Sequence, residues 1–244
     1  MVNEAILIKT KKEISKFILD NGMSNIVSIY GIGSIAKKKD NVGDIDLNIF
    51  LDNCDYDSIV QINSLKLYLK EKLEKDIDFN IIDMSIVRDN LLESDIFPHK
   101  NRHSLFLYEL SILDCLIYGE PLLDGIKFDK EDLKKECVKL TLTLVQRLNK
   151  EMLTKMSDRT PINGRKFSKY AIEFAMISRG IKNPYFLSSS EVTNVLQVIP
   201  EISEYSELME DILNCKTIPL RDSYNFIRHV SLILKADYIK KFSK

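Results

Sequence analysis

The sequence predicts an α+β fold, with a mixed sheet and its helices followed by an all-α helical-bundle domain. In the first half of the 244 residues, short alternating apolar runs typical of strands are interspersed with apolar residues at helical spacing. Beyond about residue 125, helical spacing alone recurs. A chain of this length has room for one large domain or two modest ones, so we expect a boundary near Gly125.

The elements of the first half follow from these patterns in order. Ile14, Phe17 and Ile18 precede Gly22 at helical spacing, which predicts an amphipathic helix over residues 4–21. The other elements expected here are strands at 25–31, 44–51 and 76–83, and helices at 57–75 and from His103 to Tyr118.

The second half carries three apolar stripes at helical spacing, separated by proline and glycine. Such stripes are typical of the core of a helical bundle. Their residues are Leu133, Cys137, Leu144, Leu148 and Met152; Tyr170, Phe174 and Ile177; and Ile227, Val230, Leu234 and Tyr238. The expected domains are therefore residues 1–125 and the helical residues 126–244.

The second expected strand carries two acids at alternate positions. Asp44 and Asp46 point to one face of the strand, while the intervening residues point to the other. The preceding strand leads into Gly33-Ser34, where the backbone can approach a phosphate group closely. Paired carboxylates beside such a turn suit a divalent metal and a nucleoside triphosphate.

This pattern resembles the signature of the DNA polymerase β-like nucleotidyltransferase superfamily. That signature is a hydrophobic residue, Gly, and Gly or Ser, followed after a short interval by Asp-x-Asp or Asp-x-Glu. The family needs a third carboxylate on a neighbouring strand, and both Asp76 and Asp78 lie on the next expected strand. They share a face, so periodicity leaves both open, although the position of Asp78 within the strand matches the family better.

The resemblance implies a polymerase β-like core and a two-metal-ion transfer of a nucleotide. Asp44, Asp46 and Asp78 would hold two Mg²⁺ ions, while Gly33 and Ser34 would contact the triphosphate of ATP or another nucleoside triphosphate. The expected reaction moves NMP to a hydroxyl group and releases pyrophosphate.

Other site residues are expected from the same resemblance. Glu109 is a candidate general base, since related antibiotic-modifying enzymes recruit acids from the corresponding helix. Lys166 and Lys169 in the helical half are candidates for nucleotide binding. The phrase Tyr118-Gly119-Glu120-Pro121 is similar to the end of the core in small-molecule nucleotidyltransferases. We therefore expect a small acceptor, such as an aminoglycoside or lincosamide antibiotic, and a role in antibiotic resistance.

Charge and composition bear on the partners. With 35 Lys and Arg against 36 Asp and Glu, the formal net charge is −1, which does not favour a protein that grips nucleic acid. The motifs are nevertheless compatible with a toxin-like transferase acting on tRNA or on a protein hydroxyl, or with a nucleotide-binding regulator. No apolar run approaches the roughly 20 residues of a membrane span. We expect a cytoplasmic monomer or homodimer.

Two other motifs share these residues. Gly31-x-Gly33-x-x-Ala36 fits a dinucleotide-binding fingerprint, but the interval before the next strand is too short for a crossover helix. The acids from Asp44 onward could begin a calcium loop, but Ile49 and Asp55 occupy the positions that need Gly and Glu.

Overall fold

The computed structural model describes residues 2–37, 43–87, 103–158, 164–181, 184, 191–214 and 216–242. The chain divides into two compact units, Met1–Lys127 and Phe128–Lys244. We describe each unit by itself. Within the described ranges, no helix has both the length and the apolar character needed to cross a membrane.

Unit 1 mixes helices and strands. Its elements in chain order are α1 (Val2–Asp20), β1 (Ile26–Ile32), α2 (Gly33–Ala36), β2 (Asp44–Leu51), α3 (Tyr56–Leu73), β3 (Asp76–Asp83), α4 (Met84–Val87), α5 (His103–Leu113) and β4 (Leu116–Gly119).

The strands described in unit 1 form one mixed sheet in the order β3-β2-β1-β4. β1 is antiparallel to both β2 and β4, whereas β2 and β3 are parallel. The parallel pair is connected by α3, as parallel strands require. The expected α+β class is thus confirmed.

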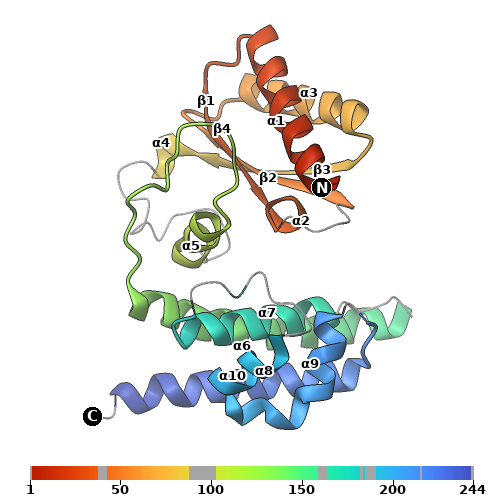
Figure 1. Cartoon of the computed structure of the whole chain (residues 1–244), viewed down its shortest axis with the longest axis vertical. Helices are drawn as coiled ribbons and strands as arrows, with labels where there is room; N and C mark the ends of the chain where they lie inside the picture. Colours follow the sequence, from red (N-terminus) through yellow and green to blue (C-terminus); the bar gives the residue numbers. More distant parts are fainter. Residues whose placement is uncertain are drawn as a thin grey trace. The chain divides into compact units, whose positions relative to one another are not determined.

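The sheet is buried on the face that carries the alternate apolar residues of β2. Ile45, Leu47 and Ile49 on this face are at most 1% exposed. Figure 1 shows α1 and α3 on one side of the sheet and α5 on the other. The two helices of the first side are joined by Tyr68, whose hydroxyl donates a hydrogen bond of 2.6 Å to Glu13.

The helix expected from His103 to Tyr118 is wrong in its second part. α5 ends at Leu113, Asp114 has a positive φ of 42°, and Leu116–Gly119 form strand β4. Leu116, Ile117 and Tyr118 include β-branched and aromatic residues that suit a strand, and the free edge of β1 offers them backbone partners. Tertiary pairing therefore overrides the helical spacing.

The dinucleotide-binding interpretation of Gly31 and Gly33 is excluded by the topology. That fingerprint belongs to two parallel strands joined by a long crossover helix. Here β1 and β2 are antiparallel, and the helix that begins at Gly33 has four residues.

Unit 2 is helical throughout its described residues. Its elements are α6 (Lys130–Asp158), α7 (Gly164–Ser178), α8 (Val192–Val198), η4 (Pro200–Tyr205), α9 (Ser206–Leu213) and α10 (Leu220–Phe242). Each expected stripe contains buried residues: Cys137 in the first stripe and Ile227 in the third are 0% exposed, and Phe174 in the second is 3% exposed.

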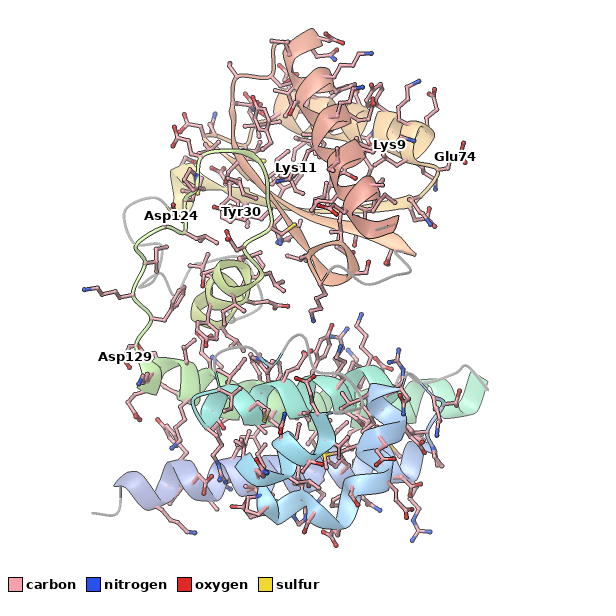
Figure 2. All side chains as sticks on the ribbon, in the orientation of Figure 1. Lys9, Lys11, Tyr30, Glu74, Asp124 and Asp129 are labelled. Carbon is pink, nitrogen blue, oxygen red and sulfur yellow. The ribbon has the colours of Figure 1, made fainter. Side chains whose placement is uncertain are left out.

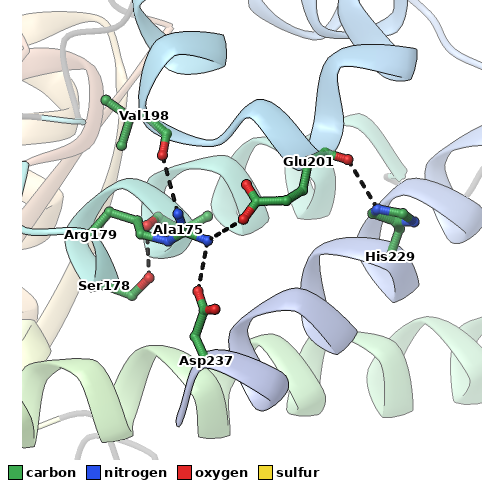
Figure 3. A network of polar contacts seen from close by, with 7 residues as sticks. All are labelled: Ala175, Ser178, Arg179, Val198, Glu201, His229 and Asp237. Carbon is green, nitrogen blue, oxygen red and sulfur yellow. Dashed lines mark hydrogen bonds and ion pairs between the residues drawn. The ribbon is translucent and has the colours of Figure 1, made fainter. Parts of the chain in front are cut away.

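One arginine connects three helical segments of unit 2 (Figure 3). Arg179, just after α7, donates from Nη2 to Glu201 of η4 at 2.9 Å and forms an ion pair of 2.7 Å with Asp237 of α10. Its Nη1 also donates to the carbonyl oxygen of Val198 at 3.3 Å. The hydrogen bond from Arg179 holds the pKa of Glu201 below its ordinary value.

We expect Arg179→Met to lower the free energy of unfolding of unit 2 by about 1–3 kcal/mol, because both carboxylates lose a charged donor. Urea-induced unfolding followed by circular dichroism measures this loss. Lys216→Met is the control, since Lys216 pairs with Asp211 at 2.6 Å but is 62% exposed, and such surface pairs contribute little. Equal losses in the two variants would contradict the structural role of Arg179.

Candidate active site

The turn after β1 brings Gly33 against an acid of β2. Ile32 is the register partner of Asp46, so the chain turns directly beside that carboxylate. Gly33 has a φ of +62°, and a Cβ built on it would lie 2.7 Å from Oδ2 of Asp46. The positive φ favours glycine here, and any side chain would force the Asp46 carboxylate to shift.

Ser34 ties this turn to the beginning of β2. Its hydroxyl donates a hydrogen bond of 3.1 Å to the backbone carbonyl oxygen of Asp44. The sequence predicts a phosphate as the partner of this hydroxyl, but in the structure its partner is the backbone. Ser34 thus holds the turn next to the strand that carries the acids. A contact of Ser34 with phosphate stays a prediction.

The register of the parallel strands aligns four carboxylates in two rows. Asp44 is the partner of Asp76, and Asp46 is the partner of Asp78. Register partners on neighbouring strands point to the same face, and the strands lie about 4.8 Å apart. All four side chains therefore belong to one face, on which Asp46 is half-buried and the other three acids are exposed.

The two acids near the beginning of β3, Asp76 and Asp78, each lie close to a lysine of α3. Asp78 Oδ1 lies 3.8 Å from the Nζ of Lys66, and Asp76 Oδ1 lies 2.7 Å from the Nζ of Lys70. The hydrogen bond and charge of Lys70 hold the pKa of Asp76 below its ordinary value. These lysines were not predicted as part of the site, because their sequence spacing is that of any solvent-exposed helix face.

In the part of the chain that the structure describes, no three His, Cys, Asp or Glu side chains lie close enough together to hold a metal ion. The residues nevertheless fit a divalent cation in two respects. Carboxylates are the hard oxygen donors that Mg²⁺ prefers. In addition, Gly33 leaves room beside Asp46 Oδ2 that any other side chain would fill.

A pair of amides continues the two rows of acids along the same face. Asn48 follows Asp46 on β2 and is the register partner of Asn80 on β3. Asn80 Nδ2 donates a hydrogen bond of 2.9 Å to Asn48 Oδ1. Asn48 is 0% exposed, and its Nδ2 has no hydrogen-bond partner among the described residues. The repeated Asp-x-Asp-x-Asn pattern of the two strands was the available signal for this pair.

A cavity of about 240 Å³ lies on the acid-bearing side of the sheet, next to β1. Tyr30, the register partner of Asn48, lines it together with Asp114 and Asp124. Figure 2 labels Tyr30 and Asp124. Burial raises the pKa of Tyr30, and the charges of both aspartates raise it further. Ser111 also lines the cavity. The cavity wall therefore combines the carboxylates of the two aspartates with the hydroxyl groups of Tyr30 and Ser111.

Glu109, the predicted general base, lies in α5 and is half-buried. The described residues Leu110 and Ser111, which follow it, line the cavity. Its catalytic role stays a prediction.

The two predicted lysines of unit 2 have different surroundings. Lys169 is 17% exposed and lies 3.7 Å from Oε1 of Glu173, which is buried. Lys166 is exposed, and its Nζ lies 6.0 Å from the centre of the Tyr170 ring. Nucleotide binding by either lysine stays a prediction. The run of three lysines that follows the Gly33-Ser34 turn in the sequence, Lys37-Lys38-Lys39, lies mostly outside the described residues.

The comparisons with known proteins give no relative for this site: no family model matches the sequence, and no curated protein matches it.

We expect Gly33→Ala to destabilise unit 1 more than Gly22→Ala, as measured by urea denaturation. Both glycines have a φ of +62°, so alanine adds about 1–2 kcal/mol of backbone strain at either position. A Cβ at Gly22 would meet nothing within 4 Å, whereas at Gly33 it would meet the carboxylate of Asp46. Similar losses in both variants would show that the close approach to Asp46 does not matter.

Proposed function

We propose that unit 1 is a polymerase β-like nucleotidyltransferase core that transfers NMP from a nucleoside triphosphate, with ATP the expected donor, to a hydroxyl group of a small molecule. The observation that carries the proposal is the register of β2 and β3. It places Asp46 and Asp78 side by side, while Gly33 keeps the adjoining turn open beside Asp46.

Asp44, Asp46 and Asp78 would hold Mg²⁺, which supplies charge neutralisation at the phosphates and activation of the attacking hydroxyl. The residues around them have separate tasks. Gly33 allows a phosphate to approach the backbone, and Ser34 keeps the turn in place through the carbonyl oxygen of Asp44.

The bonding changes balance without a further reactant. The acceptor oxygen forms a bond to the α-phosphorus, the bond between the α-phosphorus and its bridging oxygen to the β-phosphate breaks, and pyrophosphate leaves. The acceptor proton passes to a base, for which Glu109 is the candidate. Stabilisation of charge along this in-line path, together with positioning, provides most of the catalysis in phosphoryl-group transfer.

The cavity beside Tyr30 supports a small acceptor that carries amino groups. Asp114 and Asp124 make it negatively charged, which attracts ammonium groups and repels the backbone of a nucleic acid. An aminoglycoside or lincosamide antibiotic has this chemistry, and such a modification would confer resistance. The formal net charge of −1 supports the same choice over tRNA.

The function is tested by incubating the full chain with labelled nucleoside triphosphates, Mg²⁺ and a panel of aminoglycosides and lincosamides. We expect label on an antibiotic and release of pyrophosphate. Asp44→Asn and Asp46→Asn should reduce the rate at least about a hundredfold, because several kcal/mol of charge stabilisation are lost. Asp20→Asn, an exposed acid at the end of α1, is the control and should keep full activity.

The same experiment distinguishes the alternatives. Label on tRNA or on a protein would support a toxin-like transferase in place of antibiotic modification. Full turnover in Asp44→Asn or Asp46→Asn would refute the assigned acids, and nucleotide binding without any transfer would indicate a regulator.

Of the two acids of β3 that are register partners of Asp44 and Asp46, we expect Asp78 to be essential and Asp76 dispensable. Asp78 is the register partner of Asp46, which lies beside the Gly33 turn. Asp76 is the register partner of Asp44 at the beginning of β2, and it forms an ion pair of 2.7 Å with Lys70. Asp78→Asn should therefore lose activity to the same extent as Asp46→Asn, while Asp76→Asn retains most of it. The opposite order, measured as kcat with the same acceptor, would assign the third metal ligand to Asp76.

A further inference from the structure

Two lysines of α3 lie close to Asp76 and Asp78 of the edge strand β3, in matching order. Lys66 and Lys70 are one helical turn apart, so they lie on the same side of the helix. Asp78 and Asp76 are two residues apart, so they lie on the same face of the strand. The resulting pairs are Lys66 with Asp78 at 3.8 Å and Lys70 with Asp76 at 2.7 Å.

The pair at Asp78 bears on the proposed site, because this carboxylate is the neighbour of Asp46 in the sheet. Like charges on adjacent strands repel each other. The ammonium group of Lys66 offsets this repulsion at Asp78 Oδ1. A divalent cation shared by Asp46 and Asp78 would also offset the repulsion between them. Such a cation would bind the carboxylate of Asp78, which is the group that Lys66 contacts.

We propose that Lys66 is a positioning residue that competes with the metal ion for Asp78 and so weakens the metal affinity of the site. This inference rests on the proposed function, since it assumes that Asp78 is a metal ligand. In the metal-free protein Lys66 forms a weak, solvent-exposed ion pair with Asp78, and metal binding would replace this ion pair with coordination. The site then binds metal tightly only when a nucleotide adds its own phosphate oxygens.

Lys70 provides a matched control on the same helix. It has the same charge, reaches the same strand and forms the shorter of the two ion pairs. Its partner Asp76 is opposite Asp44 rather than Asp46. Removing Lys70 therefore changes the charge near the acids without releasing Asp78.

The experiment measures the affinity of the full chain for Mn²⁺, without nucleotide, by electron paramagnetic resonance of the free ion. The variants are Lys66→Met, Lys66→Arg and Lys70→Met, because methionine keeps the length and helix propensity of lysine. We expect Lys66→Met to bind Mn²⁺ about two- to fivefold more tightly, as befits an exposed ion pair. Lys66→Arg should bind like the wild type, and Lys70→Met should change much less than Lys66→Met.

A gain of affinity cannot arise from partial unfolding, so it separates this role from a structural one. Unchanged or weaker Mn²⁺ binding in Lys66→Met would overturn the inference while leaving the proposed function intact. An equal gain in Lys70→Met would overturn it too, since the effect would then be one of net charge. If Asp46→Asn in the Lys66→Met background bound Mn²⁺ as tightly as Lys66→Met alone, the bound ion would not use Asp46 and the proposed metal site itself would be refuted.

Discussion

The parallel register of β2 and β3 is the constraint on which the candidate site of unit 1 depends. Parallel pairing of β2 and β3 aligns Asp44 with Asp76 and Asp46 with Asp78. Each strand thus contributes two acids at alternate positions to the same face. The sheet tolerates them because Asp44, Asp76 and Asp78 are exposed to solvent and two lysines of α3 reach the acids of β3. Like charges at opposed positions of neighbouring strands are a departure from local rules, and such departures are often found at functional sites.

The strands that carry the site could be predicted from the sequence, because alternation of apolar and acidic residues is a local signal. The same alternation left Asp76 and Asp78 equivalent. The pairing of β3 with β2 gives them different neighbours, Asp44 for Asp76 and Asp46 for Asp78, and pairing depends on residues far apart in the chain. The partners of the acids were missed for the same reason, since nothing in the spacing of Lys66 and Lys70 indicates which strand they face.

Where local and tertiary signals disagreed, the tertiary one prevailed. Residues 116–119 continue a helical spacing, yet they pair with β1 as β4. In unit 2 the apolar stripes predicted the buried faces of the helices, whereas the polar contacts of Arg179 with Glu201 and Asp237 could not be predicted. Apolar burial follows from periodicity, but ion pairs between helices depend on how those helices cross.

The amide pair of Asn48 and Asn80 has a consequence for how the chain selects its strand alignment. Slippage of β3 by one residue would turn its acids and Asn80 toward the apolar layer, at a large desolvation cost. Slippage by two residues would keep the faces but break the amide contact, leaving the buried Asn48 without its hydrogen bond. Misaligned forms of the sheet are therefore disfavoured by the row of residues that continues the site, so the register that satisfies the amide pair is also the one that sets the acids of β2 and β3 opposite each other.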